Sequence, residues 1–106
     1  MVGYIYYITM PYSDFTKSKG RPVLVYKSID KNDLLVLPLT SNLQREGIRI
    51  SEREIEDGRL QKESIIIVPK LTAVDSSLIS GARFIASLKK SAFTRVQEEL
   101  CSKLGC

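Results

Sequence analysis

Short apolar runs separated by polar turns occupy most of this chain, and the pattern changes only near its end. β-Branched and aromatic residues dominate the runs, which is typical of strands in a sheet that is covered on both faces. Segments with this pattern are 2–9, 22–28, 34–40, 47–51, 63–69, 70–74 and 83–88. The hydrophobic pattern therefore predicts a protein built mainly from short strands.

From about residue 90 the apolar residues recur at helical spacing. Phe93, Val96, Leu100 and Leu104 form one amphipathic stripe, and Gly105 is a suitable residue to follow a helix. Segment 75–81 is predicted to be a turn with one helical turn in it. We therefore expect a mainly β (α+β) fold, in which a small, strongly bent sheet or barrel packs against a C-terminal helix. A length of 106 residues is typical of one domain, 1–106.

Composition narrows the chemistry that the chain can perform. The formal net charge of +4 favours an acidic partner such as nucleic acid, although an ordinary basic domain is as consistent with it. The absence of histidine excludes histidine-based metal sites and nucleophile systems. Cys101 and Cys106 match neither a zinc site nor a redox motif, and we interpret them as a small residue beside the helical stripe and a terminal thiol. We expect no metal and no cofactor.

Nothing in the sequence resembles a targeting signal or a membrane span. No apolar run approaches the ~20 residues of a membrane span, and the N-terminus lacks the basic region of a secretory signal. The expected location is therefore the cytoplasm, with no membrane partner.

The most basic stretch is Lys17-Ser18-Lys19-Gly20-Arg21-Pro22, at the end of a predicted loop over 10–20. We interpret Gly20 as a turn residue and Pro22 as the first residue of a strand, which holds Arg21 at the strand edge. A guanidinium with lysines beside it suits a phosphate group. The alternatives are that Arg21 is a loop arginine paired with Asp14, and that the lysines are ordinary solvated charges.

A second polar cluster, Thr40-Ser41-Asn42, follows the apolar strand 34–40. Strand ends often carry chemistry, because the scaffold fixes the side chain while the loop leaves it accessible. The alternative for Thr40 is a β-branched residue that simply closes a strand.

Three blocks of the sequence resemble the MazF/PemK-like toxins of type II toxin–antitoxin systems. The resemblance covers nearly the whole chain, and the blocks occur in the order of the family. They are Pro11-Tyr12-Ser13-Asp14-Phe15 with 18–25, then Leu37-Pro38-Leu39-Thr40-Ser41, then Leu60 with 64–68 and 70–75.

The resemblance implies an SH3-like barrel of the MazF/CcdB type with a C-terminal helix, assembled as a homodimer. It also implies a metal-independent endoribonuclease that cuts single-stranded RNA at short sequences and is inhibited by a cognate antitoxin. The key arginine of the family falls on Arg21 and its key threonine on Thr40. In place of the arginine that several members carry in the third block, this chain has Lys70 or Thr72.

These assignments lead to a mechanistic hypothesis in which Arg21 stabilises the charged phosphorane and Thr40 orients the phosphate or the 2′-OH. Residues expected to bind RNA beside them are Lys17, Lys19, Ser41, Asn42, Lys70 and Thr72. Asp14 and Asp75 are possible supporting groups for proton transfer. Two other functions stay open at this point: a toxin of the same fold that acts on a protein such as gyrase, and a non-catalytic barrel that binds nucleic acid.

Overall fold

The computed structural model describes residues 2–10 and 19–106, without the side chains of Met10 and Lys19. The described strands are β1 (Tyr4–Met10), β2 (Lys19–Ser28), β3 (Asp33–Thr40), β4 (Ile48–Ile50), β5 (Ile55–Gly58), β6 (Ser64–Ile66), β7 (Thr72–Asp75) and β8 (Arg83–Leu88). The helices are the 3₁₀ turns η1 (Glu52–Glu54) and η2 (Val68–Lys70), the short α1 (Ser77–Ser80) and the C-terminal α2 (Lys90–Leu104).

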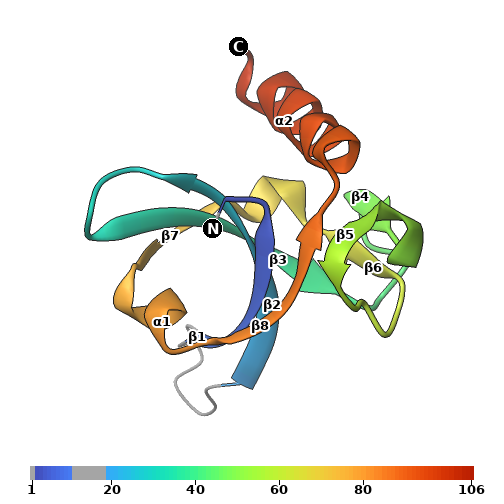
Figure 1. The fold of residues 1–106 in the computed structure, drawn as a ribbon. Helices are drawn as coiled ribbons and strands as arrows, with labels where there is room; N and C mark the ends of the chain where they lie inside the picture. The colour runs from blue at the N-terminus through green and yellow to red at the C-terminus, as the bar shows by residue number, and fades with distance from the viewer. Residues whose placement is uncertain (1, 11–18) are drawn as a thin grey trace.

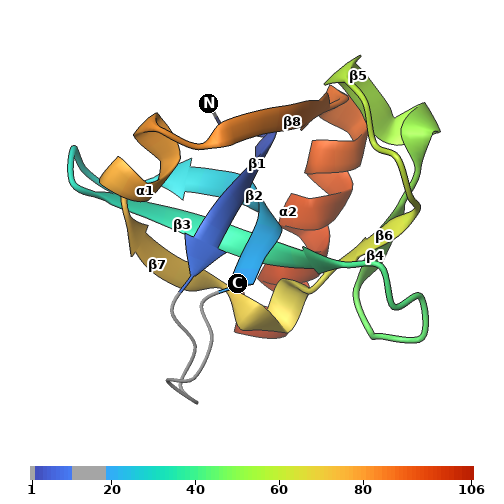
Figure 2. The same cartoon turned by 90° about the horizontal axis from the view of Figure 1, so that it is seen from below.

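The strands form one curled antiparallel sheet, in which their order is β4-β6-β3-β2-β1-β8-β5 and β7 pairs with β3. The sheet bends round into an incomplete barrel, and α1 lies between β7 and β8 where the ring closes (Figure 1). Helix α2 lies outside this ring, which Figure 2 shows from a second direction. The predicted strand-rich, bent sheet with a C-terminal helix is therefore confirmed.

Each long strand has two apolar faces because it separates two hydrophobic clusters. Successive side chains of a strand point to opposite faces, so Val23 and Val25 join one cluster while Leu24 joins the other. The inner cluster fills the barrel and consists of Ile8, Val23, Val25, Leu34, Val36, Val74 and Ile79. The outer cluster lies under α2 and includes Ile5, Leu24 and Leu37. Full burial of one such side chain stabilises the fold by about 1.5–3 kcal/mol.

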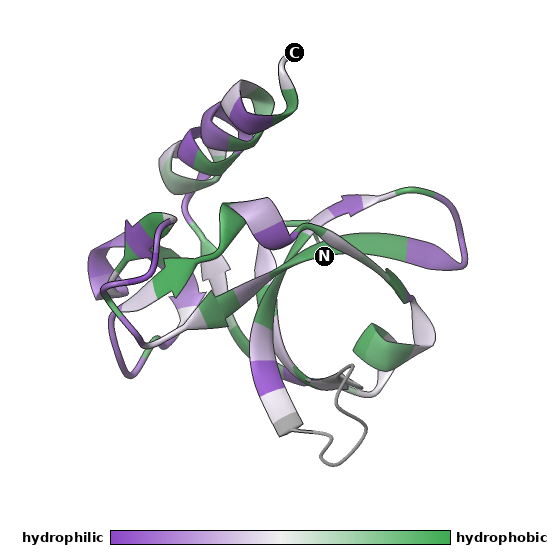
Figure 3. Ribbon diagram, turned by 180° about the vertical axis from the view of Figure 1, so that it is seen from behind, coloured by the Kyte–Doolittle hydropathy of each residue, from purple (hydrophilic) through white to green (hydrophobic). Residues whose placement is uncertain are grey.

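Helix α2 covers the outer cluster with one face, as its spacing predicts. Val96 and Leu100 are buried in it, and Phe93 stacks on Tyr26 with ring centroids 5.6 Å apart. Leu104 is the exception, since 68% of it is exposed. Figure 3 shows hydrophilic and hydrophobic residues side by side on α2, and hydrophilic residues at the turn between β2 and β3.

The end of α2 differs from the sequence-based interpretation. Gly105 takes the left-handed conformation (φ 81°) and donates its N–H to the Cys101 carbonyl over 2.9 Å. This turn brings the chain back on itself, so that Cys106 also donates to the Cys101 carbonyl and the two sulfurs form a disulfide. The expectation of two separate thiols is therefore wrong.

Two element boundaries also differ from the predictions. Strand β2 begins at Lys19, so Arg21 and Pro22 lie inside a strand rather than at its start. Pro22 is tolerated there because pairing between β2 and β3 begins only at Val23, which leaves β2 with β1 as its paired neighbour at that point. Segment 52–58, for which the apolar pattern predicts no strand, contains β5, and this strand pairs with β8.

Candidate active site at the barrel rim

Arg21 is held by the pairing of β2 with β1. It stands opposite Ile8, a buried residue of the inner cluster. Because side chains alternate along a strand, Arg21 shares a face with Val23 and Val25, which fill the barrel interior. The Arg21 side chain is half-buried and lies at the rim of the barrel beyond these valines.

Thr40 is the last residue of β3 and is also half-buried. Its neighbour across the sheet is Ile65 of β6, which is buried. The backbone N–H of Asn42 donates to Thr40 Oγ1 over 3.2 Å, so the hydroxyl acts as an acceptor for the turn that follows. A hydroxyl that accepts in this way still has its own proton to donate to another group.

The register of β2 and β3 indicates that these two residues lie on the same face of the sheet. The last paired residues of this ladder are Val23 and Pro38. Arg21 precedes Val23 by two residues and Thr40 follows Pro38 by two, so an extension of the same register sets them opposite each other. Both side chains therefore lie on one face, at the end of the barrel where the ladder stops.

Other residues predicted to bind RNA are distributed around this end. Ser41 and Asn42 are exposed directly after Thr40. Lys70 is exposed at the end of η2, a turn that is tied to β3 because the Ile67 N–H donates to the Pro38 carbonyl over 2.9 Å.

Thr72 and Lys19 both lie in paired strands. Thr72 stands opposite Val36 in β7, and its hydroxyl donates to the Lys70 carbonyl over 2.9 Å. Lys19 pairs with Met10 at the start of β2. Lys17 and Asp14 lie outside the described residues.

Asp75 lies at the opposite end of β3 from Thr40. It pairs with Asp33, the first residue of that strand, which places it roughly 23 Å from Thr40 at about 3.3 Å per residue. Its carboxylate accepts the backbone N–H of Ser77 over 2.9 Å. The hydrogen bonds from Ser77 lower the pKa of Asp75 below its ordinary value of 3.8. Asp75 therefore supports the turn into α1 and not the rim.

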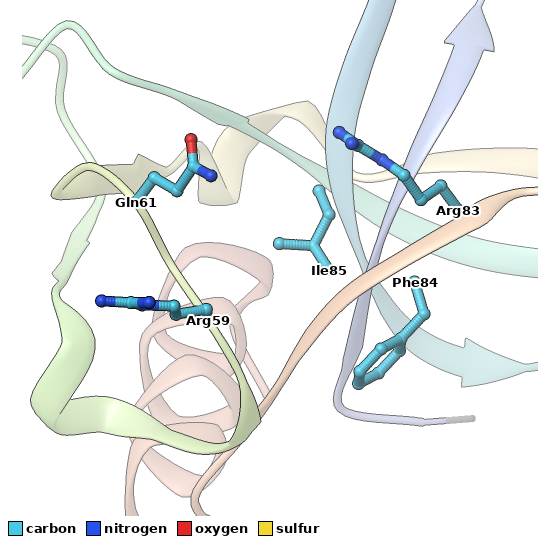
Figure 4. A pocket seen from close by; sticks show the side chains of 5 residues that line it. All are labelled: Arg59, Gln61, Arg83, Phe84 and Ile85. Atoms are coloured by element: carbon cyan, nitrogen blue, oxygen red, sulfur yellow. The ribbon is translucent and has the colours of Figure 1, made fainter.

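Sequence reasoning missed a pocket of about 310 Å³ on the outer face of the sheet. Arg59 and Gln61 line it from the segment between β5 and β6, and Arg83, Phe84 and Ile85 line it from β8 (Figure 4). These residues carry no motif, and their two segments are far apart in the sequence. The alternation along 83–88 indicates that Arg83 and Ile85 share a face, but the opposing segment cannot be identified without the β5–β8 pairing.

None of the helices in the described part of the chain has the length and apolar character that crossing a bilayer requires. Within the same residues, no three His, Cys, Asp or Glu side chains gather as metal ligands.

Comparisons with known proteins agree with this architecture. A family model described as "PemK-like, MazF-like toxin of type II toxin-antitoxin system" matches residues 1–104. The fold is similar to that of MazF from Deinococcus radiodurans, with a TM-score of 0.71, 16% identity, and coverage of 99% of this chain and 96% of that one. It is also similar to a chain of the MazE-MazF structure from the same organism, with a TM-score of 0.73, 16% identity, and coverage of 98% and 94%. By sequence, no curated protein matches the chain.

Proposed function

Because the chain belongs to the family of PemK-like, MazF-like toxins of type II toxin–antitoxin systems, we propose that it is an endoribonuclease that cleaves single-stranded RNA. The observation that carries this proposal is the shared face of Arg21 and Thr40 at the end of the β2–β3 ladder. A guanidinium and a hydroxyl on one face of two neighbouring strands suit a phosphodiester. Both side chains are half-buried, so each is held by the fold and still within reach of a ligand.

Arg21 is proposed to stabilise the negative charge that develops on the phosphorus oxygens. A fixed positive group aimed at developing charge is usually the largest single contribution to catalysis. The planar guanidinium suits this task because it offers two parallel donors to two oxygens of one phosphate.

Thr40 is proposed to orient the scissile phosphate or the 2′-OH. Its Oγ1 already accepts the N–H of Asn42, which directs the hydroxyl proton toward another acceptor. Ser41 follows it in an exposed turn and is proposed to assist.

The reaction proposed here uses a nucleophile that RNA itself carries. The 2′-oxygen forms a bond to phosphorus and loses its proton, the bond from phosphorus to the 5′-oxygen breaks, and the 5′-oxygen gains a proton. The products are a 2′,3′-cyclic phosphate and a 5′-OH end. The proposal assigns charge stabilisation and orientation to the protein and includes no metal ion.

Partners follow from the same assignment. Lys17, Lys19, Asn42, Lys70 and Thr72 are proposed to contact the RNA on either side of the cleaved bond. The chain is proposed to act in the cytoplasm as a homodimer whose activity is blocked by a cognate antitoxin. The MazE-MazF structure from Deinococcus radiodurans, to which the fold is similar, supports a partner of this kind.

The test is incubation of the purified protein with single-stranded RNA in the presence of EDTA, followed by sequencing of the new 5′ ends. We expect cuts at a short recurring sequence that leave 5′-OH ends. RNA that is bound but stays intact contradicts the nuclease and indicates a non-catalytic binding barrel. RNA that is neither bound nor cut, together with inhibition of gyrase, indicates a toxin with a protein target.

A further inference from the structure

The pocket on the outer face is built by backbone contacts between β5 and β8. Gly58 has a left-handed conformation (φ 82°), and a Cβ atom there would overlap the carbonyl of Ile85. The close approach lets the next residue, Arg59, donate its N–H to the Ile85 carbonyl over 3.1 Å. The Leu60 N–H then donates to the Glu52 carboxylate over 2.8 Å, which fixes the segment that carries Arg59 and Gln61.

Arg83 is positioned on the other side of the pocket by Tyr7. The two residues stand opposite each other in β8 and β1, and the guanidinium carbon of Arg83 lies 5.2 Å from the centroid of the Tyr7 ring. A cation over an aromatic face is attracted to it, so the contact restricts where the guanidinium can go. Figure 4 shows Ile85 between the two groups of side chains, with Arg59 and Gln61 on one side and Arg83 on the other.

The chemistry of this lining suits an anion. None of the five lining residues is acidic, and within the described ranges neither Arg59 nor Arg83 forms an ion pair with a carboxylate. Arg59 and Arg83 supply positive charge on the two sides of the pocket, and in Figure 4 the Arg59 guanidinium extends away from Ile85. The amide of Gln61, which can both donate and accept, extends toward Ile85. Half-buried Ile85 gives the pocket an apolar floor.

The position of the pocket relative to the barrel rim indicates which molecule carries the anion. Tyr7 connects the two places, because it pairs with Arg83 on one side and with Pro22, the neighbour of Arg21, on the other. Arg83 and Pro22 are therefore two strand spacings apart, roughly 10 Å, so one short single strand can reach from the pocket to the rim. The pocket lies on the outer face and Arg21 on the inner face, so a strand bound at both passes over the rim.

We propose that the pocket formed by Arg59, Gln61 and Arg83 is a second RNA subsite, which binds a phosphate and the adjoining nucleotide away from the cleaved bond. This inference rests on the proposed ribonuclease function. RNA is favoured over an acidic peptide because the pocket combines phosphate-binding arginines with an amide that can reach a base edge and an apolar surface beneath it.

The experiment measures RNA binding separately from cleavage. The probe is a fluorescent single-stranded RNA that contains the mapped cut site with a 2′-deoxy nucleotide at the cleaved position, so that it binds without being cut. The variant is Arg59→Ala/Arg83→Ala, and the matched control is Arg95→Ala, an exposed arginine of α2 that does not line the pocket. Binding is measured over a range of salt concentrations.

Removal of both arginines should raise Kd roughly tenfold, since each charge-assisted contact that is lost weakens binding. The slope of log K against log salt should fall by about 0.7 if one phosphate contact disappears. With cleavable RNA, KM should rise while kcat and the cut sequence stay unchanged, because a contact remote from the reacting bond contributes equally to substrate and transition state. Arg95→Ala should behave like the unchanged protein.

Three outcomes overturn the subsite. The first is a double variant that binds RNA like the Arg95→Ala control while the unchanged protein cleaves normally, which leaves the proposed function standing. The second is unchanged RNA binding with weakened binding of the purified antitoxin, which assigns the pocket to an acidic peptide. The third is that the unchanged protein neither binds nor cleaves RNA, which contradicts the proposed function as well. If the double variant is unstable, Arg59→Ala alone replaces it, because this variant keeps the contact of Arg83 with Tyr7. It should raise Kd for the RNA roughly threefold.

Discussion

Arg21 and Thr40 lie on neighbouring strands, each two residues beyond the last paired residues of the β2–β3 ladder, Val23 and Pro38. Pro38 has no N–H and is the last residue of β3 that pairs with β2, while the opposite edge of β3 pairs with β6 at Leu39 and Thr40. The ladder therefore ends before it reaches Arg21 and Thr40. Two residues separated by 18 others in the sequence are in this way brought to the same face of the sheet.

Replacement of Arg21 tests the charge at this rim. Arg21→Ala should lower kcat for RNA cleavage by at least about 100-fold, since it removes the group proposed to stabilise the phosphorane. Arg21→Lys keeps the charge but loses the planar fork, so it should recover only part of the activity. The rate is measured with labelled single-stranded RNA in EDTA, and circular dichroism checks that each variant is folded. Full activity in Arg21→Ala excludes the proposed role.

Replacement of Thr40 tests the hydroxyl without a change of shape. Thr40→Val should reduce kcat by about 100-fold, as removal of one transition-state donor does elsewhere, while Thr40→Ser should stay within about tenfold of the unchanged protein. The double variant Arg21→Ala/Thr40→Val should be no slower than Arg21→Ala alone if the two groups act on one phosphate. If the losses of kcat in the two single variants multiply in the double variant, the two groups act independently, which contradicts a shared site.

Gly20 is required by a close contact and not by a turn. A Cβ atom at Gly20 would overlap the ring of Tyr7, which lies against the backbone of β2 at that point. Gly20→Ala should therefore destabilise the fold by about 1–3 kcal/mol, as overpacking does. For a domain of this size, each 1 kcal/mol corresponds to roughly 4–8 °C in Tm.

The matched control for Gly20 removes the ring instead. In a Tyr7→Ala background, Gly20→Ala should change Tm by no more than about 2 °C, because the methyl group then has space. Thermal unfolding followed by circular dichroism measures both effects. An equal loss of Tm in both backgrounds shows that Gly20 is needed for its backbone conformation and not for the space that the Tyr7 ring occupies.

Much of the fold can be predicted from the sequence because local patterns determine it. The helix over 90–104 follows from the spacing of Val96 and Leu100, and its end follows from Gly105. The long apolar strands follow from the requirement to face two hydrophobic clusters. These features depend on neighbours along the chain, so they can be recognised in a single sequence.

The remaining features depend on contacts between distant segments. The sequence indicates that Gly20 is a turn residue, whereas the structure shows the Tyr7 ring against it. Segment 55–58 has no apolar pattern typical of a strand, and its strand is recognised only by its pairing with β8. The pocket of Arg59 and Arg83 likewise exists only through the β5–β8 pairing. A shared site for Arg21 and Thr40 is expected from a family resemblance, whereas the register that sets them on one face beyond Val23 and Pro38 is visible only in the structure.

Asp75 should affect stability at neutral pH and leave catalysis unchanged. The Ser77 hydrogen bonds lower the pKa of Asp75 in the folded protein, so the ionised form is the one that the fold stabilises. A group with a lowered folded pKa contributes stability above its unfolded pKa and loses that contribution as pH falls through the folded value. Asp75→Asn should therefore have a lower Tm than the unchanged protein at pH 7, and the difference should shrink as pH falls below about 3.8.

RNA cleavage by Asp75→Asn should match that of the unchanged protein, because Asp75 lies at the far end of β3 from Thr40. A large loss of kcat in an Asp75→Asn variant with normal Tm would instead indicate that Asp75 takes part in catalysis.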